Sequence, residues 1–278
     1  MLYPCGLQCD NSGMGSSWGP RGVFRKAHPE TLHVASDTGE GPVVILVHGV
    51  ASSSTIFDRL VPLLNNKYRV IAIDLLGFGG SPAPEDATYT LEEHVAWLRA
   101  TIKALRLKAP FILVGHSLGG LLASRYAAQH PGKVSRLVLV SPPIYLTPRA
   151  IGDPRMRAVA GAYLRAYEFL RENKAFTLRN AAVLTRLMPV KNSFEITEAN
   201  WRAFVLSMEN CIESQTTISD IAAVRVTVEI VYGTLDPFIV PAGLRIVEQM
   251  RHVTVHRVRA NDHVIRPRLA RAVAKVIG

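Results

Sequence analysis

The pentapeptide Gly115-His116-Ser117-Leu118-Gly119 has the residue types and spacing of a serine nucleophile on a sharp turn. It follows an apolar run at 111–114 and precedes a helical pattern that extends from about residue 118 to 130. A serine between a strand and a helix presents its hydroxyl at the edge of the sheet, and small residues two positions away on either side let neighbouring backbone pass. The following helix directs free N–H groups at the reacting centre. The motif therefore predicts that Ser117 attacks a carbonyl carbon.

The elements that must hold this turn appear as strand-length apolar runs between helical patterns. The expected strands cover 43–47, 69–73, 111–114, 137–140, 226–232 and 253–258. Several are apolar on both faces, which is typical of parallel strands covered by helices on either side. Thr90 and Glu93 form a capping box for a helix that reaches about Leu107, and Pro267 begins a terminal helix. This alternation predicts an α/β fold with a mostly parallel central sheet flanked by helices.

The strand pattern is interrupted between residues 141 and 219, where apolar side chains follow helical spacing. We expect this segment to form a helical lid, inserted after the strand that ends near Val140, over the carboxyl edge of the sheet. The core is then built from 21–140 and 220–278, and the Gly- and Ser-rich residues 1–20 form a flexible tail. A plain continuation of the α/β layers is the alternative for 141–219.

The composition excludes several classes of protein. Of the 278 residues, 48% are apolar and 19% are charged, which is typical of a globular chain with a large core. The longest apolar stretch, 43–47, is far shorter than the roughly 18 residues of a membrane span, so no stable membrane insertion is expected. Three cysteines give no disulfide framework, and residues 1–20 lack the pattern of a secretory signal. We therefore expect a cytoplasmic protein.

The formal net charge is +10, and the basic excess is concentrated in 141–194 and in 251–278. No nucleic-acid-binding motif accompanies it, so we expect solvated basic faces and no nucleic-acid partner. The basic residues of the lid keep open a substrate with a carboxylate or phosphate, or a carrier-protein partner. The sequence contains no dinucleotide fingerprint, no phosphate-binding loop and no Cys and His ligand set, so we expect neither a cofactor nor a metal.

Four further motifs accompany the Ser117 turn. They are His48-Gly49 after the first clear strand, 74–81 after the next, 233–236 late in the chain and His263 near its end. With these motifs, the sequence from about residue 41 onward resembles the α/β-hydrolase fold family, in its serine-nucleophile, esterase- and lipase-like branch. The resemblance implies a catalytic triad of Ser117, Asp236 and His263, in the family order of nucleophile, acid and histidine.

The same resemblance implies an oxyanion hole formed by the backbone N–H groups of Val50 and Leu118, with Ala51 as the alternative to Val50. Such a donor typically stabilises the transition state by about 3 to 4 kcal/mol. His48 is then expected to brace the loop that carries Val50, and Asp74 and Ser81 are expected to hold the adjoining turn.

The base has competitors in the sequence. Serine needs a base to take its proton as it attacks. His263 is favoured because it lies in the loop between the last expected strand and the terminal helix, at the edge of the sheet where the Ser117 turn opens. His252 and His256 are the nearest alternatives, although His256 lies within the expected strand.

The acid also has competitors. Asp236 follows an expected strand and is placed to orient the imidazole and to stabilise its charged form. Asp220 and Asp153 are further candidates. Asp262 is disfavoured, because side chains of adjacent residues diverge and it directly precedes His263.

Together these features predict a serine hydrolase that cleaves a small-molecule carboxylic ester through an acyl-enzyme. Apolar side chains of the lid favour an apolar acyl or aryl part in the substrate: Tyr163, Leu164, Tyr167, Phe169, Leu170, Val183, Leu184, Leu187 and Met188. Carbon–carbon bond cleavage of the meta-cleavage-product type, thioester hydrolysis and acyl transfer use the same chemistry and stay open. A ligand-binding sensor on this scaffold is the alternative from another class. The sequence does not indicate the oligomeric state.

Overall fold

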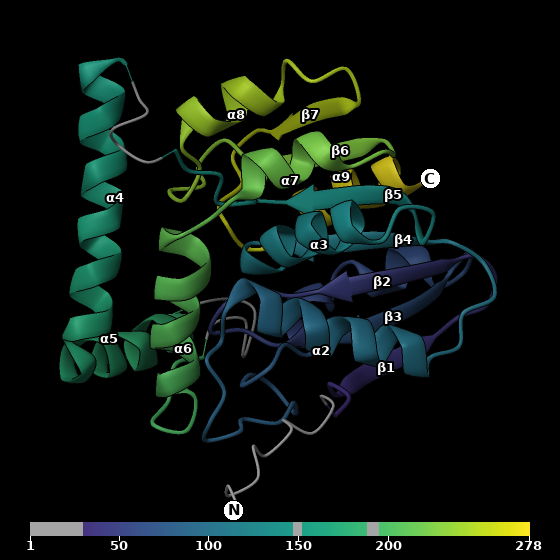
Figure 1. Cartoon of the computed structure of the whole chain (residues 1–278), viewed down its shortest axis with the longest axis horizontal. Coiled ribbons are helices and arrows are strands. Elements are labelled where there is room, and N and C mark those ends of the chain that lie inside the picture. Colours follow the sequence, from purple (N-terminus) through teal and green to yellow (C-terminus); the bar gives the residue numbers. More distant parts are fainter. Residues whose placement is uncertain (1–29, 147–151, 188–194) are drawn as a thin grey trace, which may run out of the picture.

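Seven strands form one sheet in the computed structural model, which describes residues 30–146, 152–187 and 195–278 (Figure 1). Their order across the sheet is β1-β3-β2-β4-β5-β6-β7, and every neighbouring pair is parallel except β1 with β3. The strands are β1 (Val34–Thr38), β2 (Val43–Val47), β3 (Arg69–Ile73), β4 (Phe111–His116), β5 (Val134–Val140), β6 (Val228–Gly233) and β7 (Val253–Val258). The predicted α/β fold with a mostly parallel sheet is confirmed.

The edge strand β1 is the strand that the sequence analysis missed. None of its residues is fully buried, and three of the five are polar, so no apolar run marks it. Three other strands have different bounds from those expected: β4 continues to His116, β5 begins at 134 instead of 137, and β6 begins at 228 instead of 226. The longer β4 places the residue before Ser117 on the strand itself.

Helices cover both faces of the sheet, because alternate residues of each strand point to opposite sides. In β2, Ile45 and Val47 join the apolar cluster that includes α2 (Leu91–Ala104), α3 (Leu118–Gln129), α7 (Thr217–Ala223) and α8 (Pro241–Val247). Val44 and Leu46 join the cluster on the other face, with the turn η1 (Ser54–Phe57), α1 (Val61–Leu64) and α9 (Pro267–Ile277). Figure 1 shows α2, α3 and α7 in front of the sheet and α9 behind it.

The two helix starts that the sequence predicts are found in the structure. Glu93 N donates to Thr90 Oγ1 at 3.2 Å at the start of α2, and Pro267 is the first residue of α9. The predicted end of α2, at about Leu107, lies three residues beyond the observed end. The helix stops at Ala104, and Arg106 adopts a left-handed φ of 49°, which turns the chain toward β4.

The described parts of 141–219 contain α4 (Pro154–Glu172), α5 (Lys174–Leu187), α6 (Trp201–Ser207), the π-helical turn η3 (Met208–Glu213) and the start of α7. Figure 1 shows α4, α5 and α6 beside the carboxyl ends of the strands, whereas α7 packs against α3 in the front layer. The role of this segment as a lid stays a prediction, and the predicted tail 1–20 lies outside the described residues. None of the helices in the described ranges is long and apolar enough to cross a membrane.

Candidate active site

Ser117 forms the turn between β4 and α3, with φ 54° and ψ −124°. A non-glycine residue in this region of backbone space is strained, and such strain is concentrated at functional sites. Two main-chain hydrogen bonds hold the turn. Ser117 N donates to Val140 O at 2.9 Å, and Gly120 N donates to Ser117 O at 2.8 Å. The main chain that carries the hydroxyl is therefore held by β4, β5 and α3 together.

The two glycines of the motif allow α3 to begin directly against the sheet. A Cβ on Gly119 would lie 2.3 Å from Val47 O and 2.4 Å from His48 O, at the end of β2. A Cβ on Gly115 would lie 2.2 Å from Gly119 O. All of these contacts are with backbone atoms, which cannot rotate away as a side chain can.

Gly119→Ala is therefore expected to lower the free energy of unfolding by about 3 kcal/mol, the upper part of the usual cost of overpacking. Urea denaturation would measure this loss. Gly161→Ala is the matched control, because a Cβ on Gly161 in α4 meets only the end of a flexible arginine side chain at 3.5 Å. Equal stability of the Gly119→Ala variant and the wild type would contradict the close approach of α3 to β2.

His263 and Asp236 come together from two loops that are far apart along the chain. His263 Nδ1 lies 2.9 Å from Asp236 Oδ2, and Phe238 N donates to Asp236 Oδ1 at 2.9 Å. Burial raises the pKa of Asp236, but the hydrogen bond and charge of His263 and the Phe238 N–H outweigh it, so the pKa lies below its usual value. An ionised Asp236 accepts the proton of Nδ1 and leaves Nε2 as the basic nitrogen of His263.

Asn261 joins the loop of His263 to the loop of Asp236. Its Nδ2 donates to Val264 O at 3.0 Å, and its own carbonyl accepts from Leu235 N at 2.9 Å. The neighbouring Asp262 is bound by the guanidinium of Arg266, with 2.7 Å between Oδ2 and Nη2. Asp262 is thus engaged elsewhere, in agreement with the expectation that it does not serve His263.

The loop that follows β2 passes against Ser117. A Cβ on Gly49 would lie 2.6 Å from Ser117 Cβ and 3.1 Å from Ser117 Oγ, so only glycine allows this approach. The next residue, Val50, lines the same cavity as Ser117. Leu118 is the first residue of α3, where N–H groups have no partner within the helix. Both of the donor positions implied by the family resemblance are therefore next to Ser117.

Hydrogen bonds of His48 and Asp74 hold this loop in place. His48 Nδ1 donates to Gly49 O at 2.8 Å and Nε2 accepts from Leu75 N at 2.9 Å. Burial lowers the pKa of His48, partly offset by the charge of Asp74, and a neutral ring agrees with these two bonds. Asp74 accepts from Ser54 N and from Gly80 N, and so ties the loop to the turn after β3. Ser81 Oγ donates to Asp74 O at 2.6 Å in the same turn.

His116 is a residue of this site that the sequence analysis quoted without assigning it a role. It is almost fully buried, and its Nε2 donates to the main-chain O of His263 at 2.9 Å. Burial and the nearby His263 lower the pKa of His116 to about 3, so the ring is neutral and its proton is on Nε2. The end of β4 is therefore bonded directly to the loop that carries His263.

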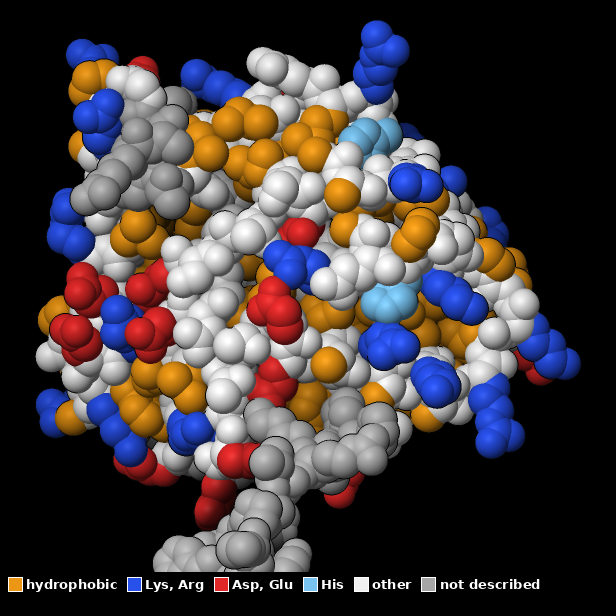
Figure 2. Space-filling model, in the orientation of Figure 1, with side chains coloured by type: hydrophobic (Ala, Val, Ile, Leu, Met, Phe, Trp, Pro, Cys, Tyr) orange, Lys and Arg blue, Asp and Glu red, His pale blue; other side chains and the backbone are white. Residues whose placement is uncertain are grey.

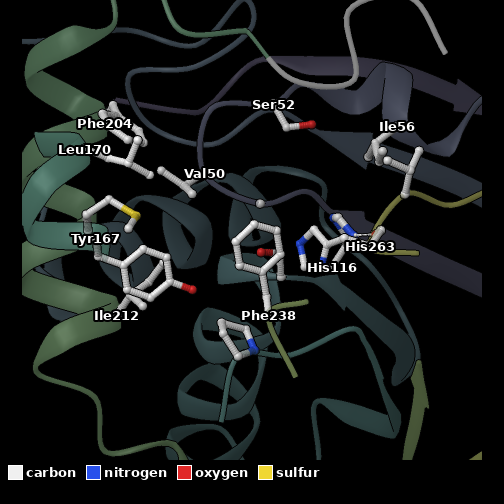
Figure 3. Close-up of a pocket in the computed structure, with 15 residues that line it drawn as sticks. Val50, Ser52, Ile56, His116, Tyr167, Leu170, Phe204, Ile212, Phe238 and His263 are labelled. Atoms are coloured by element: carbon white, nitrogen blue, oxygen red, sulfur yellow. Dashed lines mark hydrogen bonds between the residues drawn. The ribbon is translucent and has the colours of Figure 1, made fainter. Parts of the chain in front are cut away.

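Ser117 and His263 line one cavity of about 190 Å³ (Figure 3). None of the side chains in its wall belongs to Asp, Glu, Lys or Arg. The wall opposite the two residues is apolar and comes from α4, α6 and η3: Tyr167, Leu170, Phe204, Met208 and Ile212. Of the lid side chains that the sequence analysis named, Tyr167 and Leu170 reach this cavity, and Phe169 is 48% exposed. The side chains of Val183, Leu184, Leu187 and Met188 lie outside the described part of the chain.

Tyrosine hydroxyls fasten α4 to the loop of Asp236. Tyr163 OH donates to Pro237 O, and Tyr145 OH donates to Phe238 O at 3.1 Å while lying 2.5 Å from Tyr167 OH. The Phe238 ring stacks on Tyr167, and its edge contacts His263 with 4.7 Å between ring centroids. We call these four aromatic residues (Tyr145, Tyr163, Tyr167 and Phe238) the tyrosine clasp.

The sequence model of the alpha/beta hydrolase fold matches residues 42–265, which is most of the chain. The chain belongs to the α/β-hydrolase fold family.

Curated relatives share a shorter segment with this α/β-hydrolase. It is 43% identical over 114 residues to Probable lysophospholipase BODYGUARD 1 of Arabidopsis thaliana, which is 39% of this chain and 24% of the plant protein. It is 38% identical over 103 residues to the pimeloyl-[acyl-carrier protein] methyl ester esterase of Aeromonas hydrophila, which is 37% of this chain and 39% of that protein. The matched segment thus spans about a quarter of the plant relative's length.

Solved structures resemble this α/β-hydrolase over nearly its whole length. A serine hydrolase involved in carbazole degradation, the CarC enzyme, superimposes with a TM-score of 0.65 at 23% identity, covering 87% of this chain and 91% of that one. At this level of identity the likeness shows a shared fold.

The competing residues of the sequence analysis do not line the cavity of this α/β-hydrolase. Each of them has another partner: Ile221 O for His252, Glu229 for His256, Arg125 for Asp220 and Arg155 N for Asp153. Among the candidates in the described residues, His263 is bonded to Asp236 and shares one cavity with Ser117.

The sequence analysis missed part of the cavity wall. Phe204, Met208 and Ile212 follow one another at spacings of four, which places them on one side of the continuous helix formed by α6 and η3. This spacing is visible in the sequence and could have predicted that the three side chains share one helix face. Pro143 and Phe238 lie in loops and carry no comparable pattern.

Proposed function

We propose that this protein is a cofactor-independent serine hydrolase that cleaves a carboxylic ester with an apolar acyl or aryl part. The observation that carries the proposal is that His263, which shares a cavity with Ser117, lies 2.9 Å from Asp236 behind the cavity wall. A strained serine, a histidine with one nitrogen held by a buried carboxylate, and a cavity that can hold the substrate are the parts that acyl transfer requires.

In the proposed reaction Ser117 Oγ attacks the ester carbonyl carbon while His263 Nε2 takes the hydroxyl proton. The carbonyl oxygen becomes negative and receives hydrogen bonds from the N–H groups of Val50 and Leu118. His263 then gives its proton to the leaving alcohol, which leaves the acyl group on Ser117. A water molecule attacks the acyl-enzyme with the same help and releases the acid. Asp236 stabilises the imidazolium of His263 in both halves.

The cavity supports an apolar group in the substrate. A wall without charged side chains offers no compensation for burying a carboxylate or an ammonium group, and desolvating an unpaired charge is costly. The names of two relatives, a probable lysophospholipase and a methyl ester esterase, favour ester bonds among the possible acyl bonds.

p-Nitrophenyl esters of increasing chain length test the substrate class. We expect kcat/KM to rise about fourfold for each methylene that enters the cavity, since burying one methylene contributes about 0.8 kcal/mol. Met208→Trp fills the far wall and is expected to move the best substrate toward shorter chains by about two methylenes.

Met208→Leu is the matched control for that variant, because it conserves volume and leaves the chain-length optimum in place. A wild-type profile that is flat from acetate to dodecanoate would contradict an acyl chain bound against η3.

Thioesters and vinylogous diketones belong in the same assay, because the proposed residues serve these substrates as well. A kcat/KM on either class that exceeds the best ester by more than tenfold would replace the ester assignment and keep the triad.

The turnover rate distinguishes a ligand sensor from a hydrolase. If kcat stays far below 1 per second on every substrate while a ligand raises the melting temperature, the cavity serves binding instead of turnover.

A further inference from the structure

A second cavity, of about 430 Å³, lies at the edge of the sheet opposite to the Ser117 cavity. It is bounded by the ends of α2 and α3 and by the starts of β4 and β5. Because β4 runs from Phe111 in this cavity to His116 beside the nucleophile, the two cavities are separated by the length of a six-residue strand, about 20 Å. A ligand here would not touch a substrate at Ser117.

Five exposed cationic side chains and no carboxylate line this second cavity: Arg99, Lys103, Arg106, Lys108 and Lys133. None of the ion pairs among the described residues includes any of the five. Elsewhere this chain does pair its cations, as Arg125 does with Glu92 and Asp220. Figure 2 shows Lys and Arg side chains gathered on the right-hand side, where α2 ends in Figure 1. Unpaired like charges at one concave site favour a bound anion.

Tyr126 adds a hydrogen-bond donor to the wall of this cavity. Its residue is only 3% exposed, but its hydroxyl is not among the buried polar atoms that lack a partner, so the hydroxyl opens into the cavity. No hydrogen bond to another described residue occupies it, which leaves it available to a ligand. Burial raises the pKa of Tyr126 to about 12, although nearby Arg99 opposes this, so the hydroxyl keeps its proton and can donate it.

His130 holds the Tyr126 ring in place. The two rings are stacked with 4.4 Å between centroids, and His130 Nδ1 donates to Tyr126 O at 3.0 Å. On its other side the ring contacts Phe111, at 6.2 Å between centroids. The hydroxyl of Tyr126 is therefore held by rigid neighbours from α3 and β4.

We propose that this second cavity binds a ligand that carries phosphate groups. The guanidinium groups of Arg99 and Arg106 have the geometry to bind phosphate oxygens in pairs, and the Tyr126 hydroxyl supplies a further donor. Five positive charges exceed what one carboxylate would neutralise, which favours a multiply charged phosphate. Apolar wall residues, Ile102 and Leu107 among them, offer contact area to the rest of the ligand. The same chemistry is found in soluble phosphate compounds and in phospholipid headgroups.

Calorimetric titration with pyrophosphate and sedimentation with vesicles separate these two sources. Both are done at about 0.15 M salt, where weak surface attraction is screened. We expect saturable binding to pyrophosphate, or enrichment on phosphatidic acid vesicles over phosphatidylcholine vesicles, or both. Binding to pyrophosphate alone identifies a soluble ligand, and binding to vesicles alone identifies a headgroup. Neither kind of binding would overturn the proposal.

Variants of the second cavity test its location without any measurement of catalysis. Lys103→Glu with Arg106→Glu is expected to weaken binding at least tenfold, and Tyr126→Phe, which removes only a hydroxyl, about fivefold. Arg59→Glu with Arg268→Glu is the matched control, since it changes the net charge equally at exposed positions on the α1 and α9 side of the sheet. Equal weakening by the control would show attraction by net charge alone and would refute the site.

Discussion

Ser117→Ala is expected to lower kcat for ester hydrolysis by about 10⁵-fold, because it removes the atom that forms the acyl-enzyme. The fold should be unaffected. Alanine occupies less space than serine, and the main-chain bonds that hold the turn to Val140 and Gly120 do not involve the hydroxyl. Steady-state assays on the best p-nitrophenyl ester measure the loss, and circular dichroism checks the fold.

Ser135→Ala is the control for this experiment, since Ser135 is exposed at the start of β5, away from the cavity. Its activity should equal that of the wild type. Activity of Ser117→Ala within tenfold of the wild type would eliminate the proposed mechanism, whatever the substrate.

The second large effect is expected for Asp236→Asn, which should lower kcat by about 10⁴-fold with little change in KM. The amide can donate a hydrogen bond to Nδ1, and this favours the tautomer of His263 in which Nε2 carries the proton and cannot act as a base. The fall should appear in kcat because Asp236 stabilises a charge that exists only after attack has begun.

Asp262→Asn is a closely matched control, because it makes the same chemical change one residue away from His263. Since Asp262 binds Arg266 instead of the imidazole, we expect its kcat to stay within about fivefold of the wild type. If Asp262→Asn were the more damaging variant, the assignment of the acid would have to be exchanged between the two carboxylates.

The turn that carries Ser117 was predictable because its requirements are local. A strand, a helix and two glycines within five residues define it, and the structure explains both glycines by backbone contacts. The pairing of His263 with Asp236 was predicted from the family resemblance and from their places after strands. Parallel strands bring such places to one edge of the sheet, even when they are far apart in sequence.

Other features depend on contacts that no local pattern records. The edge strand β1 is polar and was missed, and the bond from His116 to the carbonyl of His263 joins residues 147 positions apart. The sequence analysis placed the basic excess at 141–194 and 251–278. Four of the five unpaired cations of the second cavity lie instead within residues 99–108, at the end of α2 and in the turn to β4, and the fold adds Lys133 from the turn between α3 and β5.

The tyrosine clasp has a consequence for the way a substrate arrives. Tyr163 binds α4 directly to the carbonyl group of Pro237, whereas Tyr167 of α4 reaches the carbonyl group of Phe238 only through the hydroxyl of Tyr145, in the loop after β5. An outward movement of α4 would break the Tyr163 bond, the Tyr145–Tyr167 contact and the stacking of Tyr167 on Phe238. Phe238 would keep its bond to Tyr145, and His263 its bond to Asp236, so opening this side of the cavity to a substrate would leave the Asp236–His263 pair intact.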